Sequence, residues 1–136
     1  MALRLLSKTE TKDVEVGGTK FVVRKLPHGL SAALLRKHTS RGRVDEAAFD
    51  REVWTRILVG WTGLRDAAGR EIAFSTDEVE WPDPLTEEKR KEPLAYVVAM
   101  SLPVDVAAVL MNTARSAEAV VEEALGNSDP SSSSGR

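Results

Sequence analysis

The sequence of 136 residues contains no cysteine, and this absence removes several kinds of chemistry at once. Without thiols the chain can form no disulfide, no thiolate metal site and no cysteine nucleophile. Histidine is nearly as scarce. His28 and His38 lack the i, i+4 spacing of a helical metal pair, and no third ligand falls in pattern, so we expect no metal site. We expect His28 in a loop and His38 at a helix C-terminus, where positive charge is favoured.

The sequence also lacks long apolar runs and the common catalytic motifs. No run reaches the ~18 residues of a membrane span, and the first eight residues are too short and too charged for a secretory h-region. There is no P-loop, dinucleotide-binding glycine pattern or Gly-x-Ser-x-Gly elbow. The carboxylates occur in short clusters that are typical of solvated faces. We therefore predict a protein that is not an enzyme and binds no cofactor.

The net charge is only −2, but the charges are unevenly distributed: acidic residues are scarce in the first third of the chain, and basic residues are outnumbered in the rest. Residues 1–43 carry ten Lys/Arg and three Asp/Glu (10 − 3 = +7), whereas residues 44–136 carry nine and eighteen (9 − 18 = −9). This asymmetry fits a solvated surface of mixed charge, head-to-tail self-association, or a nucleic-acid surface at residues 36–43. The pI of about 5.7 and the lack of interleaved aromatic residues argue against a dedicated nucleic-acid binder.

The N-terminal part predicts a β-hairpin over residues 13–23. Val14 and Val16 alternate with a charged residue, and Gly17-Gly18 supplies a two-residue turn that needs positive φ. The returning segment is rich in β-branched and aromatic residues.

Helical spacing dominates the remainder. Short helices are expected at residues 30–37 and 94–100, and a stronger one at residues 45–59, capped by Asp45. Phe49, Val53, Ile57 and Trp61 step by four along that stronger helix. Residues 77–81 read as at most a helical turn, and residues 86–92 as a solvated charged run.

The last predicted helix spans residues 104–125, after Pro103 and before a Gly126 cap. The prediction is thus an α+β fold, mainly α-helical, with an N-terminal β-hairpin and about four helices in residues 30–126. Residues 1–126 form one globular domain, and residues 127–136 are a disordered Ser-rich tail.

The segment from Val53 to Ser75 is the most informative part of the chain. It reads as a helix that ends in Trp-x-Gly, followed by Asp-x-x-Gly, a short apolar stretch and Phe-Ser. We expect Trp61 in the core, the glycines at positions of positive φ or close approach, and Asp66 in a local side-chain turn. The matching residues are Gly60, Trp61, Gly63, Asp66, Gly69, Phe74 and Ser75.

This pattern resembles the small tail assembly chaperones of long-tailed bacteriophages. The resemblance implies a non-enzymatic protein of the host cytoplasm that is absent from the mature virion. It further implies binding to the tape-measure protein, which is kept soluble while tail-tube subunits polymerise, and in several members contact with tail-tube protein through a frameshifted product.

For the client, we expect an apolar surface on the last predicted helix, with Val109, Leu110, Val120 and Val121 as candidate partner-binding residues. One alternative is a minor tail or connector protein that stays in the virion and uses the hairpin for strand addition. A further alternative is a small nucleic-acid-binding regulator that acts through residues 36–43.

The Ser-rich tail generates the first prediction. Deleting residues 129–136 leaves the melting temperature unchanged, because the segment has no apolar side chain whose burial could offset its ordering entropy. Thermal unfolding of the full-length and truncated proteins tests this. A clear drop on truncation would mean that the tail docks on the domain.

Overall fold

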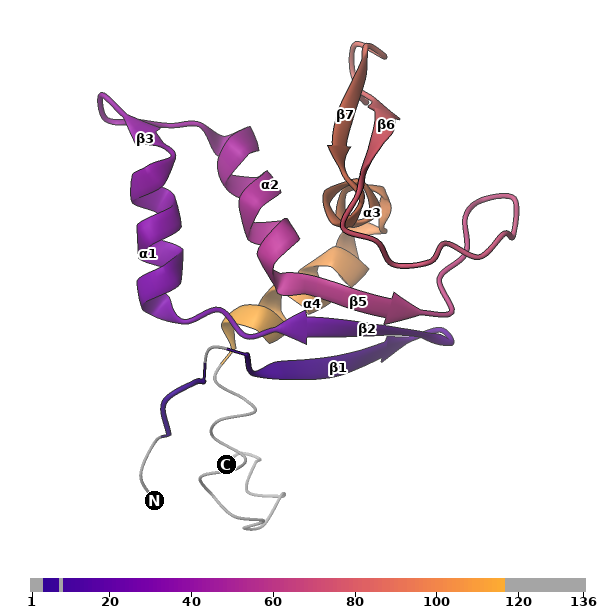
Figure 1. Ribbon diagram of the computed structural model, residues 1–136, viewed down its shortest axis with the longest axis horizontal. Coiled ribbons are helices and arrows are strands. Elements are labelled where there is room, and N and C mark those ends of the chain that lie inside the picture. Colours follow the sequence, from indigo (N-terminus) through magenta and orange to yellow (C-terminus); the bar gives the residue numbers. More distant parts are fainter. Residues whose placement is uncertain (1–3, 8, 117–136) are drawn as a thin grey trace.

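The computed structural model describes residues 4–7 and 9–116, and within them it has four helices and seven strands (Figure 1). The strands are β1 (Thr11–Val16), β2 (Thr19–Arg24), β3 (Thr39–Ser40), β4 (Arg43–Val44), β5 (Leu58–Thr62), β6 (Glu78–Pro82) and β7 (Lys89–Pro93). The helices are α1 (His28–Lys37), α2 (Glu46–Ile57), α3 (Leu94–Ser101) and α4 (Val104–Arg115). With 38% helix and 29% strand, the fold is α+β, but "mainly α-helical" understates its β content.

The predicted N-terminal hairpin is present and supplies two of the three strands of the main sheet, β1 and β2. Gly17 and Gly18 have φ of 55° and 88°, the positive values that a tight two-residue turn requires. β1 pairs antiparallel with β2, and β5 pairs with the other side of β2, which gives the order β1-β2-β5. The central strand therefore carries Phe21 and Val23 into the core, where both are almost fully buried.

The helix predicted over residues 45–59 is shorter than expected, and this corrects the placement of Trp61. Asp45 caps α2 as predicted, since its Oδ1 accepts a hydrogen bond from the Ala48 amide (3.1 Å). The helix ends at Ile57, however, and Trp61 lies on β5 opposite Phe21. The β-branched Val59 and Thr62 and the aromatic Trp61 of β5 suit a strand, and pairing with β2 satisfies its backbone. Four-residue spacing alone could not show where the helix stops.

α1 begins at His28, so the prediction that this histidine lies in a loop is wrong. Pro27 precedes the helix with extended backbone, and the amide of Ser31 already bonds to the Pro27 carbonyl (3.1 Å). Gly29 falls in the first turn of the helix. His38 is the C-cap residue of α1, as expected.

Residues 78–93 form a hairpin, which corrects the expectation of a helical turn and a solvated charged run. β6 alternates Glu78, Val79, Glu80 and Trp81, which is the period of a strand with one buried face. Trp81 packs edge-to-face on Tyr96 of α3, with ring centroids 5.9 Å apart. Pro82 and Pro84, which follow Trp81, indicated the end of a short helix, so the alternation of a strand was not recognised from the sequence.

α3 and the start of α4 agree with the prediction, but the end of α4 does not. α4 stops at Arg115, and Ser116 follows with extended backbone, ten residues before the predicted end at Leu125. Residues 117–136, with the predicted Gly126 cap and the Ser-rich tail, lie outside the described residues.

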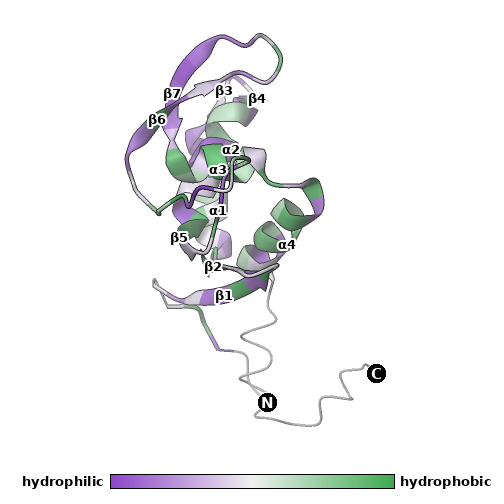
Figure 2. Ribbon diagram, turned by 90° about the vertical axis from the view of Figure 1, so that its right-hand side faces the viewer, coloured by the Kyte–Doolittle hydropathy of each residue, from purple (hydrophilic) through white to green (hydrophobic). Residues whose placement is uncertain are grey.

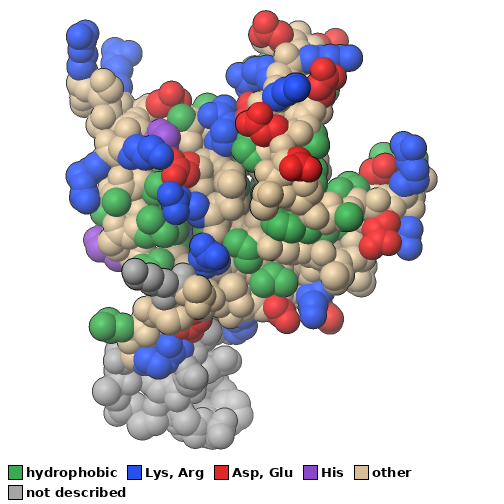
Figure 3. Space-filling model, in the orientation of Figure 1, with side chains coloured by type: hydrophobic (Ala, Val, Ile, Leu, Met, Phe, Trp, Pro, Cys, Tyr) green, Lys and Arg blue, Asp and Glu red, His purple; other side chains and the backbone are tan. Residues whose placement is uncertain are grey.

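The four helices and the strands β1, β2, β5 and β6 contribute to one hydrophobic core. The main sheet occupies one end of the molecule, and the β3–β4 and β6–β7 hairpins project from the opposite end (Figures 1 and 2). The β3–β4 hairpin carries basic side chains at its tip (Figure 3). Its two-residue turn is held by Arg41 and Gly42, both with positive φ. Residues 39–43 are therefore a small hairpin and not the open loop that their composition indicates.

Trp61 tests how far the core depends on one aromatic side chain. Trp61→Ala lowers the free energy of unfolding by about 3–5 kcal/mol, because it removes a large buried ring. Trp61→Phe retains an aromatic ring but loses the indole hydrogen bond, worth about 1 kcal/mol, and some buried ring volume, so its cost is smaller than that of the alanine variant. Urea denaturation of both variants measures the difference. If Trp61→Ala keeps wild-type stability, the side chain is not part of the core.

Candidate protein-interaction surface

The stretch from α3 through α4 is almost uncharged. Between residues 94 and 114 the only charged residue is Asp105, although 29% of the whole chain is charged. Inward-facing residues of the two helices explain part of this composition, because α3 buries Tyr96 and Val98, and α4 buries Leu110 and Ala114. Most of the other apolar side chains pack at least partly against the core, but Met100, Val104 and Val109 are exposed and are not accounted for by it.

Three of these side chains are substantially exposed and surround the corner between the two helices. Val104 is 87% exposed, Val109 46% and Met100 40%. Val104 and Val109 belong to the outer face of α4, together with exposed Ala108 and Asn112. Figure 2 shows mostly hydrophobic colours along α4. We name Met100, Val104, Ala108 and Val109 the corner patch.

A buried lysine attaches the C-terminal end of α4 to the main sheet. Lys25 follows β2 and is only 2% exposed. Its Nζ donates to the carbonyls of Thr113 (2.6 Å) and Ser116 (2.7 Å), at the end of α4, and the Leu26 amide donates to the Ala114 carbonyl (2.8 Å). The last carbonyls of a helix lack intrahelical partners and carry partial negative charge, so an ammonium group stabilises them. The helix is thereby fixed to the central strand of the sheet.

The predicted partner-binding residues divide into three groups. Val109 is exposed, as the prediction requires. Leu110 is fully buried (0% exposed), so its prediction as a partner contact is wrong: it points into the core between α4 and the sheet. Val120 and Val121 lie outside the described residues. Met100 and Val104 were missed, and the signal that could have found them is the shortage of charge across residues 94–114.

The residues of the family-like segment pack against one another and against the sheet. Trp61 donates from Nε1 to the Ile72 carbonyl (2.8 Å), and its ring meets Phe74 edge-to-face at 4.9 Å. Gly63 has φ of 77°, and a Cβ there would lie 2.7 Å from the Gly18 carbonyl oxygen. A larger residue at position 63 would therefore collide with the turn of the N-terminal hairpin.

Asp66 forms the local turn that the sequence predicts. Its Oδ1 accepts hydrogen bonds from the amides of Ala68 and Arg70 (both 2.9 Å). These bonds, the one from Arg70 first, hold the pKa of the Asp66 carboxyl below its ordinary value. Gly69 completes the turn with positive φ, whereas Gly60 has neither positive φ nor a close contact, which corrects the expectation for Gly60. As a paired position of β5, Gly60 has ordinary strand geometry.

Ser75 completes the segment by accepting a hydrogen bond from the Asp77 amide at its Oγ (2.9 Å). The segment thus consists of packing contacts and turn hydrogen bonds. It builds the connection between β5 and β6 and brings no pair of reactive groups together.

A buried ion pair connects α2 to β7. Glu92 is almost fully buried and accepts from Arg51 Nε (2.6 Å), and the Arg51 guanidinium lies over the Tyr96 ring (5.5 Å). The bond to Glu92 raises the pKa of Arg51, which stays protonated, and burial raises the pKa of Tyr96. Because Glu92 is shielded from solvent and its partner does not exchange protons, the pair is a structural link and not an acid–base site.

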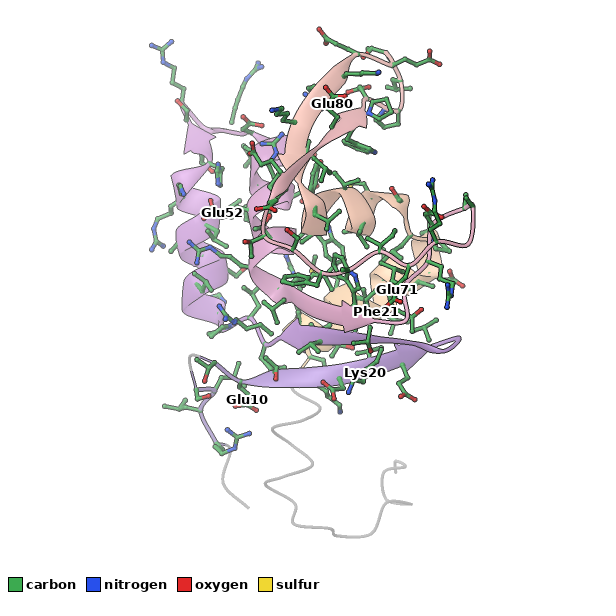
Figure 4. All side chains as sticks on the ribbon, turned by 45° about the vertical axis from the view of Figure 1, so that its right-hand side comes forward. Glu10, Lys20, Phe21, Glu52, Glu71 and Glu80 are labelled. Carbon is green, nitrogen blue, oxygen red and sulfur yellow. The ribbon has the colours of Figure 1, made fainter. Side chains whose placement is uncertain are left out.

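A second ionic cluster connects α1 to α2 and is centred on Glu52 (Figure 4). Glu52 accepts from Lys37 (2.9 Å), from Arg56 (3.0 Å) and interacts with Nε2 of His38 (2.8 Å). The Lys37 bond, then that of His38, lower the pKa of Glu52 from 4.5 to about 2. A carboxylate held this strongly in its charged form is a poor proton acceptor at neutral pH.

The surfaces required by the two alternative functions are also present in part. β1 lies at an edge of the main sheet, as strand addition requires, but Asp13 and Glu15 point outward from it, and charged side chains on an edge discourage pairing. In the basic stretch, Lys37 is occupied by Glu52, while Arg41 and Arg43 form no ion pair within the part of the chain that the structure describes.

In residues 4–7 and 9–116, no three His, Asp or Glu side chains form a group that could hold a metal ion. Over the same residues no helix has the length and apolar character to cross a membrane. Comparison of the chain with protein-family models, with curated proteins and with solved structures finds no match.

The Glu52 cluster yields a pH prediction. Because the pKa of Glu52 is lower in the folded state than in the unfolded chain, the cluster stabilises the fold fully above about pH 4.5, and this contribution is lost as pH falls toward 2. Glu52→Gln therefore lowers the melting temperature by several degrees at pH 7 and by progressively less as the pH is lowered through this range. Thermal unfolding of both proteins across pH 2.5–7 measures this, and a difference independent of pH would contradict it.

Proposed function

We propose that this protein is a non-enzymatic tail assembly chaperone that binds an extended helical client, the phage tape-measure protein, through the corner patch. The single observation that carries the client-binding part is the group of exposed apolar side chains around the α3–α4 corner, in a stretch with one charge. The identity of the client comes from the resemblance of residues 60–75 to that family.

The corner patch suits an amphipathic helix. Val104, Ala108 and Val109 lie on the exposed side of α4, which they share with Asp105, the one charged residue of this stretch. Burial of apolar area supplies the affinity, at roughly 25 cal/mol per Å² removed from water. The fixed position of α4 on the sheet, through Lys25, means that little ordering entropy is lost on binding.

The second candidate function, a structural tail or connector protein, has the β1 edge in its favour. The charged residues along that edge make strand addition a weaker basis for binding than the corner patch. The two functions also differ in where the protein resides, because a chaperone is absent from mature particles and a connector stays in them.

Client capture gives the central prediction. Co-expression with the tape-measure protein of the same genome keeps that protein soluble, and the two proteins co-purify. Val104→Asp combined with Val109→Asp reduces the co-purified amount by about tenfold or more, because a charge would be buried in an apolar contact. Both residues are exposed, so circular dichroism and melting temperature stay close to wild type.

Leu5→Asp is the matched control, because Leu5 is as exposed as Val104 but lies in the N-terminal segment. It leaves capture unchanged. If the wild-type protein has no effect on tape-measure solubility and is found in purified virions, the chaperone proposal fails and the connector function takes its place.

A further inference from the structure

Two hairpins project from the same end of the molecule and carry opposite charge. β3–β4 stands at one edge of this end and β6–β7 at the other, while the main sheet lies at the far end (Figures 1 and 2). We define the basic arm as residues 35–44 and the acidic arm as residues 77–92. The basic arm holds four Lys/Arg and no Asp/Glu (4 − 0 = +4), and the acidic arm holds three and seven (3 − 7 = −4).

The basic arm combines its charge with exposed apolar side chains. Leu35 at the end of α1 and Val44 on β4 are both exposed, although they are large and hydrophobic. Val44 pairs with Thr39, whose hydroxyl bonds to the Leu35 carbonyl (2.6 Å), so the two apolar residues belong to one short segment. Arg41 lies in the turn between the two strands and Arg43 follows on β4, and neither forms an ion pair within residues 4–7 and 9–116.

The acidic arm presents an apolar residue at its tip on a well-ordered loop. Leu85 is 91% exposed. Its amide and that of Thr86 donate to Asp83 Oδ1 (2.8 and 3.0 Å), and the Asp83 amide donates to the Glu88 carbonyl (2.8 Å). These bonds fix the loop, so Leu85 can be buried without loss of backbone freedom. Glu87 and Glu88 lie beside it.

The arm is also fixed to the body of the protein. At its base, Glu92 bonds to Arg51 of α2, and Trp81 packs on Tyr96 of α3. Asp83 near the tip pairs with Arg90 of the opposite strand (3.3 Å). The hairpin therefore projects as one ordered unit, and its outer face bears Glu80 and Lys91 as a cross-strand pair (Figure 4).

We propose that two copies of this chain pair about a two-fold axis, with the acidic arm of each copy on the basic arm of the other. Leu85 of one copy would cover Leu35 and Val44 of its partner, while Glu87 and Glu88 face Arg41 and Arg43. Opposite charge orients the encounter, and the apolar contact excludes water from it.

The position of the two arms favours a two-fold symmetric dimer over an open head-to-tail polymer. Both arms lie at the same end of the molecule. A two-fold rotation that brings these ends of two copies together therefore places the basic arm of the second copy against the acidic arm of the first. The acidic arm of the second copy then lies against the basic arm of the first. Each contact then forms twice and leaves no arm unpaired. Head-to-tail growth, which the charge asymmetry along the sequence allows, would require the two arms at opposite ends. The corner patch belongs to α3 and α4 and takes no part in this pairing.

Charge exchange tests the proposal. Sedimentation equilibrium of the wild-type protein at low salt gives a dimer, which dissociates at about 1 M salt, where exposed charges are screened beyond about 3 Å. Arg41→Glu with Arg43→Glu weakens dimerisation by about tenfold or more, and so does Glu87→Lys with Glu88→Lys. All four substitutions together restore the dimer, because the charges are exchanged between the arms.

Matched controls separate pairing from general charge effects and from misfolding. Glu15→Lys with Glu71→Lys changes the net charge as much as the Glu87/Glu88 variant, at exposed positions outside both arms, and leaves the dimer intact. Leu85→Asp weakens the dimer without changing the melting temperature of the monomer, since the side chain contacts little within one copy. The proposal is overturned if the wild-type protein is monomeric at low salt. This holds even if Arg41 and Arg43 bind DNA instead. A fourfold variant that fails to dimerise also overturns it.

Discussion

The attachment of α4 to the sheet depends on one buried ammonium group. Lys25 has almost no contact with water, and burying an unpaired charge is costly, so its hydrogen bonds to the Thr113 and Ser116 carbonyls are required for this arrangement. The same bonds satisfy carbonyls that the helix itself leaves unpaired. The contact joins residues 88 and 91 positions apart in sequence. It holds the C-terminal end of α4 beside β2, while the buried Leu110 and Ala114 define the core-facing side of the helix and leave the opposite side exposed.

The buried Arg51–Glu92 pair has the corresponding role at the other end of the molecule. Glu92 lies at the base of the β6–β7 hairpin, and Arg51 reaches it from α2 while covering the Tyr96 ring. Removing Arg51 would leave the buried Glu92 carboxylate with only the more distant Arg90 (3.7 Å) as a cationic partner, which is destabilising. The pair therefore fixes the hairpin's direction relative to the helices, and with it the position of the exposed Leu85. Both ionic contacts support surfaces that lie several residues away from them.

The proposed client surface and the proposed pairing surface use different elements and different physics. The corner patch is nearly uncharged and suits an apolar helix, whose burial is insensitive to salt. The two arms combine exposed charge with single apolar residues, so their association depends on ionic strength. Pairing through the arms leaves both corner patches of a dimer exposed. Such a dimer would present two client sites, and a long helical client could engage both with an affinity above that of one site.

Local features of the fold could be predicted from sequence because they depend on residues a few positions apart. Gly17-Gly18 supplied the turn of the first hairpin, Asp45 the cap of α2, Pro103 the start of α4 and Asp66 a side-chain turn. Only the tertiary structure placed Trp61 on the strand β5 and not on the preceding helix, because the edge of β2 that pairs with β5 exists only in the folded chain. It also decided that Leu110 is buried and Val104 exposed, and that Lys25 bonds to the carbonyls at the end of α4. Each of these outcomes depends on a partner far away in sequence, and spacing along a single helix or strand carries no information about that partner.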